Sequence, residues 1–160
     1  SCGHKTIGHI SGWAGSSTGR DRQAGFCEVL ARHGIAPQIT DGMFDRETAA
    51  AAAQTMMDSA TPPDAIFVGN DHMAFAVLDT LRQEMGLSVP DDVAIVGYDD
   101  VPLAAWPAYN LTTMRQPLNR MVEATVEALL SRIDDPTVPA QRIEIDSPLI
   151  QRGTTKGPKT

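Results

Sequence analysis

Six polar or charged residues lie where an apolar run gives way to a helical pattern, or in the first turn of that helix: Arg20, Arg22, Asn70, Asp71, Asp99 and Asp100. Carboxylate and amide oxygens accept hydrogen bonds, and an arginine guanidinium donates a planar fork of N–H groups. A sugar hydroxyl both donates and accepts, so this combination suits a polyhydroxylated ligand. Arg22, Asn70 and Asp99 are the stronger candidates, because a helix cap, a turn and a surface charge can account for the other three.

An aromatic side chain would complement these groups, since the apolar face of a sugar ring packs on a flat ring. Phe44 and Trp13 both follow strand-like segments and are candidates for this role. A core position explains either residue equally well from sequence spacing alone.

Other chemistries find less support in the sequence. The glycine-rich stretch from Gly12 to Gly19 contains neither common nucleotide-binding motif. The four histidines have no metal-ligand spacing, and no serine lies in a G-x-S-x-G elbow. Asp99 and Asp100 are neighbours at a strand end, where adjacent side chains usually point apart. We therefore expect no catalytic residue, no metal and no cofactor, and an enzyme remains the least favoured alternative.

The segments that must position these residues alternate between strand and helix. Strands are predicted at residues 6–10, 37–40, 65–69, 93–97 and 143–145, and helices at 21–33, 47–57, 72–85 and 117–133. Residues 111–114 form a short segment where this rhythm changes. Alternation of this kind predicts an α/β fold with a parallel, doubly wound sheet, in which ligands bind at the carboxyl ends of the strands. Residues 153–160 contain no apolar side chain and are expected to fray.

Composition narrows the classes of partner. The 160 residues are enough for one domain, and the formal net charge of −7, without a basic stripe, argues against direct DNA binding. The sequence has neither an apolar run long enough to span a membrane nor a signal-peptide pattern at its start. Cys2 and Cys27 fit two reduced thiols, so we expect a cytoplasmic location.

Four ordered segments resemble the LacI (lactose repressor-like) family of bacterial transcription regulators. They are residues 16–26 (SSTGRDRQAGF), 63–74 (PDAIFVGNDHMA), 89–100 (VPDDVAIVGYDD) and 111–117 (LTTMRQP). The similarity runs from about Gly3 to Thr155. It implies an effector-binding core of the periplasmic-binding-protein type I, with two α/β subdomains around a ligand cleft.

The resemblance also implies roles for particular residues. Arg22 is similar to the family's ligand-binding arginine, Asn70 and Asp99 to its cleft amide and carboxylate, and Gln116 to a residue of the crossover. Phe44 lies where members often stack an aromatic ring on the effector, while Gly15 and Thr18 occupy loop positions that can touch ligand. The expected ligand-binding residues are Arg22, Asn70, Asp99, Phe44, Gln116 and Thr18.

By the same resemblance, residues 1–114 and 140–155 form the C-terminal effector-binding subdomain, and residues 156–160 a flexible tail. Residues 115–139 are a crossover and a helix that belong to an otherwise missing N-terminal subdomain. The expected function is that of an effector-sensing domain of a repressor, which binds operator DNA only through a missing helix-turn-helix headpiece. The family contact predicts a homodimer through the helix around His72–Met85.

The closest alternative is a periplasmic-type sugar-binding protein, which shares the fold and would use a similar cleft. The V-P-D-D-V and L-T-T signatures, together with the lack of a leader pattern, favour the regulator. The long helix raises a separate question, because its apolar stripe includes Leu118, Val122 and Leu129 and needs a cover. We expect it to pack on its own domain, on a second copy or on residues outside the chain.

Overall fold

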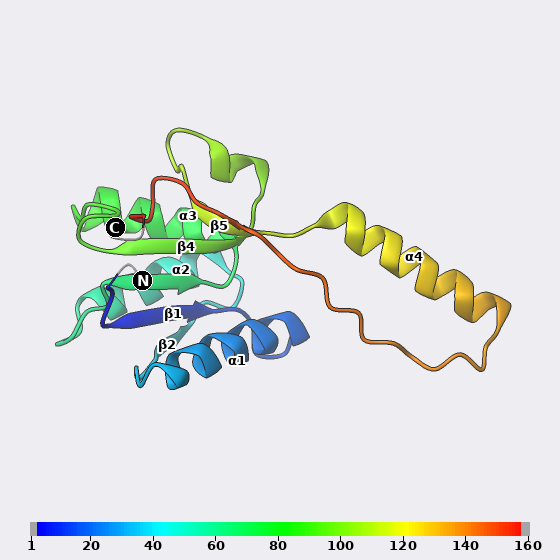
Figure 1. The fold of residues 1–160 in the computed structure, drawn as a ribbon. Coiled ribbons are helices and arrows are strands. Elements are labelled where there is room, and N and C mark those ends of the chain that lie inside the picture. Colours follow the sequence, from blue (N-terminus) through cyan, green and yellow to red (C-terminus); the bar gives the residue numbers. More distant parts are fainter. Residues whose placement is uncertain (1–2, 158–160) are drawn as a thin grey trace.

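The computed structural model describes residues 3–157 and contains a six-stranded sheet with helices on both faces (Figure 1). The strands are β1 (Ile7–Ser11), β2 (Gln38–Asp41), β3 (Ala65–Val68), β4 (Ala94–Asp99), β5 (Thr112–Arg115) and β6 (Leu149–Ile150). Their order is β2-β1-β3-β4-β5-β6, with the first five parallel and β6 antiparallel to β5. The expected α/β fold with a mostly parallel sheet is confirmed.

The helices are α1 (Ser17–Arg32), α2 (Arg46–Met57), α3 (Asp71–Asp79) and α4 (Leu118–Asp134). A π-helical turn (Thr80–Glu84) continues α3, and a 3-10 turn (Pro102–Ala105) follows β4. A polar side chain caps each of the first three helices, because Ser16, Asp45 and Asn70 accept a hydrogen bond from the third helical N–H. These caps fix where the chain turns from a strand or loop into a helix.

The hydrophobic core lies between the sheet and the layer formed by α2 and α3. Phe75, Leu78 and Leu81 are completely buried there, against Ile66 and Ile95 of the central strands. The continuous apolar runs of β3 and β4 are thus explained by burial, as is usual in parallel sheets.

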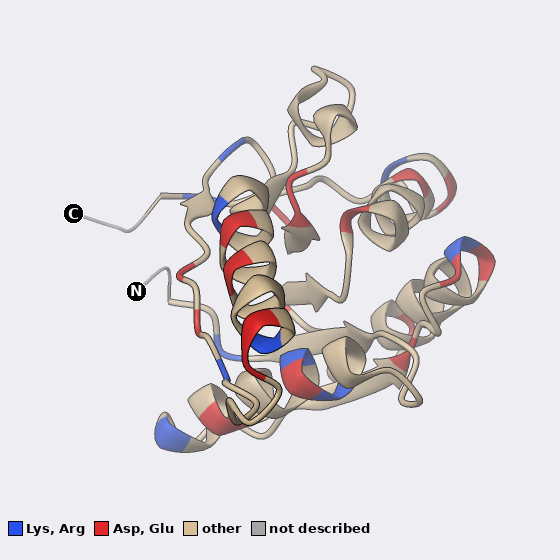
Figure 2. Ribbon diagram, turned by 90° about the vertical axis from the view of Figure 1, so that its right-hand side faces the viewer, with Lys and Arg blue, Asp and Glu red and all other residues tan. Residues whose placement is uncertain are grey.

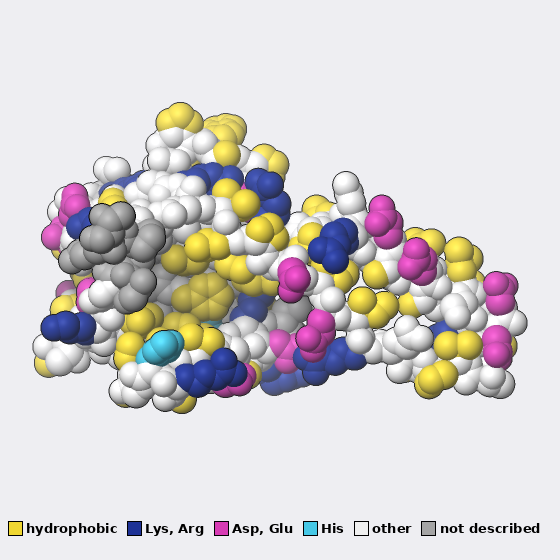
Figure 3. Space-filling view, viewed as in Figure 1, with side chains coloured by type: hydrophobic (Ala, Val, Ile, Leu, Met, Phe, Trp, Pro, Cys, Tyr) yellow, Lys and Arg dark blue, Asp and Glu magenta, His cyan; other side chains and the backbone are white. Residues whose placement is uncertain are grey.

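The opposite face of the sheet is only partly covered. α1 packs against β1, which leaves a groove of about 580 Å³ beside β3, β4 and β5. Its apolar lining is Phe26, Val29, Leu30, Phe67, Val96, Tyr98 and Met114. Part of this apolar surface is visible in the middle of Figure 3.

Helix α4 extends away from the sheet (Figure 1), and none of its residues is buried. Leu118 is 64% exposed and Leu129 58%, so its apolar stripe is uncovered by residues 3–157. The chain returns through residues 135–148, where the expected strand at 143–145 is wrong. No strand of the described chain runs beside that segment to accept its backbone hydrogen bonds; a short strand forms later, at Leu149–Ile150.

The end of the described chain also differs from expectation. Thr154 is completely buried, and its hydroxyl donates to the Ile95 carbonyl at 2.7 Å and accepts from the Thr112 N–H at 2.8 Å. The expected fraying is therefore wrong for residues 153–157, because the Thr154 hydroxyl satisfies backbone groups of β4 and β5. Lys156 pairs with Asp91 at 2.9 Å. Residues 158–160 of the predicted tail, and Cys2, lie outside the described residues, whereas Cys27 is a free thiol.

Candidate functional site

The carboxyl ends of β1, β3, β4 and β5 meet at the edge from which α4 departs, which faces the viewer in Figure 2. In that view acidic and basic residues are interspersed, and α4 carries both signs. The predicted ligand-binding residues follow these strand ends or begin the adjoining helices. Topology therefore brings distant parts of the sequence to one edge.

Arg22, on α1, reaches across this edge. Its Nη1 donates to the Gly69 carbonyl at 2.6 Å, and its Nη2 lies 3.4 Å from Asp99 Oδ1. The guanidinium also stacks over the Tyr98 ring, with Cζ 3.8 Å from the ring centroid. Three contacts, one from the end of β3 and two from the end of β4, hold this flat donor group in place. The Arg22 side chain is 15% and the Asp99 side chain 22% exposed.

Gln116 joins the same carboxylate from the crossover after β5. Its Nε2 donates to Asp99 Oδ1 at 2.5 Å, while its backbone N–H points to the Asp99 carbonyl at 3.4 Å. Asp99 Oδ1 thus accepts from both Arg22 and Gln116. Within residues 3–157, no donor forms a hydrogen bond with Asp99 Oδ2. This oxygen is therefore available to accept a hydrogen bond, and it lies next to the N–H groups of Arg22 that make no other contact.

Asp99 and Asp100 point in different directions, as the sequence analysis expected. Both have positive φ values, 126° and 57°, a region that side chains other than glycine rarely occupy. The Asp100 carboxylate pairs with Arg115 Nε at 2.5 Å and with Arg152 Nη2 at 2.7 Å. Although burial opposes it, these two guanidinium groups lower the pKa of Asp100 below its ordinary value. Asp100 consequently ties together the ends of β4, β5 and β6.

Asp71 supports the site from beneath, a role that the sequence did not reveal. It is completely buried; its Oδ1 accepts from the Thr113 hydroxyl at 2.6 Å and its Oδ2 from the Val101 N–H at 3.0 Å. Burial raises the pKa of Asp71, and both hydrogen bonds oppose that rise. Gly97 makes room for the carboxylate, since a Cβ there would lie 2.3 Å from Asp71 Oδ1.

Asn70 has a structural task at the same edge. Its Oδ1 accepts from the Met73 N–H at 2.9 Å, so it is the residue that caps α3, the task that the sequence suggested for Asp71. The neighbouring Gly69 carbonyl is the one that Arg22 contacts. Asn70 therefore lies beside the Arg22–Asp99 pair, with its amide oxygen already engaged.

The aromatic candidates lie further along the edge. A Cβ on Gly12 would lie 2.1 Å from Cζ of the Phe44 ring, so the tip of this ring contacts the backbone that follows β1. Phe44 has a φ of 56°, and Trp13 is 52% exposed with its ring folded against Gly15. Arg20 donates to the Ala14 carbonyl at 3.0 Å and is exposed, consistent with a surface role.

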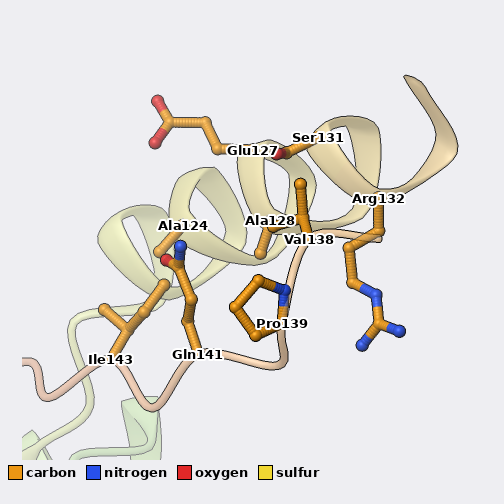
Figure 4. Close-up of a pocket in the computed structure, with 9 residues that line it drawn as sticks. All are labelled: Ala124, Glu127, Ala128, Ser131, Arg132, Val138, Pro139, Gln141 and Ile143. Atoms are coloured by element: carbon orange, nitrogen blue, oxygen red, sulfur yellow. The ribbon is translucent and has the colours of Figure 1, made fainter. Parts of the chain in front are cut away.

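A cleft of about 500 Å³ opens beside Arg22, Tyr98 and Gln116 and is bounded on its far side by the start of α4 and the return segment. Its lining includes Thr18, Arg22, Tyr98, Gln116, Met121 and Glu144. A smaller hollow of about 240 Å³ separates α4 from the return segment (Figure 4). Pro139 and Ile143 face Ala124 and Ala128 across it, and it includes neither Arg22 nor Asp99. Of the predicted ligand-binding residues, Thr18, Arg22 and Gln116 line the larger cleft, whereas Asn70, Asp99 and Phe44 are not among its lining residues.

Among residues 3–157, no three His, Cys, Asp or Glu side chains gather as a metal site would require. In the same residues, no helix combines the length and apolar character needed to cross a membrane.

Comparison with known proteins gives a consistent result. Residues 1–155 match the family model described as a periplasmic binding protein-like domain. The chain is 37% identical over 157 residues to the HTH-type transcriptional repressor PurR of Photobacterium profundum. It is 34% identical over 157 residues to the ribose operon repressor of Escherichia coli. These alignments cover 96% and 95% of this chain and 47% of each relative, so the chain spans less than half of their length.

Solved structures agree with the fold. A complex of the transcriptional regulator CelR with cellobiose superposes with a TM-score of 0.86 at 32% identity, covering 95% of this chain and 47% of that chain. A lac repressor dimer bound to operator and the anti-inducer ONPF gives a TM-score of 0.87 at 28% identity, over 96% of this chain and 54% of that chain. The chain therefore belongs to the periplasmic binding protein-like family, with the effector-binding type of domain found in LacI-type repressors.

Proposed function

We propose that this chain is the effector-sensing part of a transcription repressor and that its cleft binds a small sugar or a similar polyhydroxylated metabolite. The observation that carries this proposal is the convergence of Arg22, Asp99 and Gln116, which come from three segments of the chain. A guanidinium beside a free carboxylate oxygen matches a pair of neighbouring hydroxyls, because one can donate to the carboxylate while the other accepts from the arginine.

The charge of the pair favours a neutral ligand over an anionic one. Arg22 already lies against Asp99, so it offers hydrogen bonds without an unbalanced positive charge. A phosphate group would meet the carboxylate as well as the guanidinium. A sugar ligand agrees with the name of the ribose operon repressor and with the cellobiose complex of CelR. Because PurR repressors are also relatives, nucleobases must be tested as ligands as well.

Thr18, Asn70 and Phe44 are proposed as further ligand contacts. Thr18 is exposed and lines the cleft. Asn70 uses its amide oxygen as a cap, which leaves its NH₂ group as the part able to donate to a ligand. The Phe44 ring lies next to Gly12, and the apolar face of a sugar would stack on this ring.

The same proposal assigns residues 115–139 to a crossover and a helix of a second subdomain, with residues 1–114 and 140–155 forming the subdomain described above. The uncovered stripe of α4 supports this assignment, because such a stripe needs apolar partners. Ligand would stabilise closure of the two subdomains and so change how a headpiece elsewhere in the longer protein binds operator DNA. In this account the protein is a cytoplasmic, non-enzymatic homodimer, with the exposed side of α3 at the contact.

Isothermal titration of the full-length protein tests the proposal. The panel contains neutral pentoses, hexoses and disaccharides, their phosphates, and nucleobases. At least one neutral sugar should bind, and Asp99→Asn should weaken it about tenfold to a hundredfold, the range for a lost charged hydrogen bond of about 1.5–3 kcal/mol. Asp58→Asn, an exposed carboxylate at the end of α2, serves as the matched control. Binding that tolerates Asp99→Asn as well as Asp58→Asn would contradict the proposed site.

A further inference from the structure

The chain leaves the sheet for α4 and returns from it at one place on the sheet edge (Figure 1). The outgoing connection follows β5 at Gln116–Pro117, and the returning connection enters β6 from Ser147–Pro148. The Arg115 N–H donates to the Pro148 carbonyl at 2.9 Å. Within residues 3–157, no strand pairing joins the two connections beyond this bond. The groups that hold the chain here therefore determine the direction in which α4 leaves the sheet.

One carboxylate, that of Asp100, holds both connections, and its side chain is only 5% exposed. Its Oδ2 pairs with Arg115 Nε at 2.5 Å, at the end of the outgoing strand. Its Oδ1 pairs with Arg152 Nη2 at 2.7 Å, just after the returning strand. Arg152 Nη1 also donates to the Leu111 carbonyl at 2.8 Å. We call Asp100, Arg115 and Arg152 the Asp100 clamp, because pairs of this kind are strong and directional.

The backbone that carries the Asp100 clamp is itself fixed. Asp99 and Asp100 have φ values of 126° and 57°, so the chain turns sharply and sends their carboxylates in different directions. The buried Asp71 carboxylate supports this turn from beneath, where it faces the backbone N–H groups of Asp100 and Val101. One rigid turn therefore carries both the carboxylate proposed to bind ligand and the carboxylate that holds the connections.

The cleft described above lies directly beyond the Asp100 clamp. Gln116, Pro117 and Met121 line it from the outgoing side, and Arg142 to Ile145 and Ser147 line it from the returning side. The direction of the two connections therefore sets the shape of the cleft. Helix α4 has 17 residues and is about 26 Å long, so a change of about 10° at its base moves its far end by about 4 Å.

We propose that Asp100 is a positioning residue, which fixes the direction of both connections and so places the second subdomain over the cleft. The inference rests on the two-subdomain arrangement proposed above, and it does not depend on which ligand binds. The competing explanation is that Asp100 only stabilises the edge of the sheet at β6. In that case its loss would lower the stability of the fold but would not change where α4 lies in molecules that remain folded.

Double electron–electron resonance on the ligand-free, full-length protein tests the proposal. Spin labels are attached at Thr55→Cys on α2 and Ser131→Cys on α4, both exposed, after the other cysteines are replaced by serine. Asp100→Asn keeps a residue type that tolerates this backbone turn but removes the charge that pairs with the two guanidinium groups. The distance distribution should widen by at least about 4 Å, the movement that a change of about 10° at the base of α4 produces. Asp91→Asn, which removes an ion pair with Lys156 before the start of β4, is the matched control and should leave the distribution unchanged.

A second variant covers the case in which circular dichroism shows Asp100→Asn to be unfolded. Arg115→Gln releases the outgoing connection alone, from a side chain that is 53% exposed, and should widen the distribution as well. If the folded variants keep the distribution of the labelled parent, the Asp100 clamp is overturned, while the proposed sugar site stands. If the parent distribution is already as wide as that of Asp100→Asn, the placement of α4 in a second subdomain is overturned, and this inference with it.

Discussion

Replacing Thr113 by valine tests whether the buried Asp71 carboxylate holds the edge of the sheet together. The two side chains have nearly the same shape, so the change removes one hydroxyl from a site that is completely buried. That hydroxyl donates to Asp71 Oδ1 at 2.6 Å, while the Val101 N–H donates to Oδ2 at 3.0 Å. A hydrogen bond to a charged group contributes about 1.5–3 kcal/mol, and we expect Thr113→Val to lower the free energy of unfolding by that amount.

The loss should depend on pH in a definite direction. Burial raises the pKa of Asp71 and the Thr113 hydrogen bond opposes the rise, so removing the hydroxyl raises the pKa further. A carboxyl whose folded pKa lies above its unfolded value stabilises the fold fully at low pH and loses that contribution as pH increases. The difference between Thr113→Val and wild type should consequently be larger at about pH 7 than near pH 4.

Urea unfolding followed by far-ultraviolet circular dichroism is the appropriate assay, because Trp13 and Trp106 are both exposed and report weakly on the core. Thr55→Val on the exposed face of α2 is the matched control and should change stability by less than about 0.5 kcal/mol. If Thr113→Val unfolds at the same urea concentration as Thr55→Val, Asp71 does not depend on Thr113 and the reasoning is refuted.

Three further predictions concern the same fold. Burial lowers the pKa of His9 in the folded protein below its ordinary value of 6.5. Stability from the neutral imidazole is therefore complete above about pH 6.5 and falls as the pH decreases. In His9→Leu, the urea concentration at the unfolding midpoint should change less between about pH 7.5 and pH 5 than it does in the wild type. Phe75→Ala should cost about 3–5 kcal/mol in the same unfolding assay, and a loss below about 1 kcal/mol would contradict its place in the core. Gly97→Ala should cost at least about 1–3 kcal/mol, because its Cβ would lie 2.3 Å from a fixed carboxylate oxygen; a melting temperature equal to that of wild type would contradict this.

Most of the fold could be predicted from local patterns. Periodic apolar residues, and the polar Asn70–Asp71 pair before α3, indicated the helix starts to within a few positions, and buried strands appeared as short apolar runs. The prediction at residues 143–145 failed because an alternating apolar pattern indicates a strand only where a neighbour can pair with it. Thr154 was missed for a related reason: a hydroxyl-rich end looks solvent-exposed until its hydrogen bonds to β4 and β5 are known.

The candidate site was predictable in part. Arg22, Asp99 and Gln116 follow from the rule that parallel strands end at one edge, and their contacts agree with it. The contact between Tyr98 and Arg22 could not be predicted from the residues near Tyr98 in the sequence. The pattern of side chains along β4 does not show which helix side chain will stack on the Tyr98 ring. That Asn70 and not Asp71 caps α3 depends on backbone angles at the start of the helix, which sequence spacing alone does not supply.

A crystal structure of the full-length protein with the neutral sugar that binds it best would show whether Arg22, Asp99 and Gln116 hold the ligand. We expect sugar hydroxyls within hydrogen-bond distance of Asp99 Oδ2 and of the Arg22 guanidinium, with Gln116 still bound to Asp99 Oδ1. A sugar held elsewhere, with the Arg22–Asp99 pair in contact only with water, would contradict this expectation.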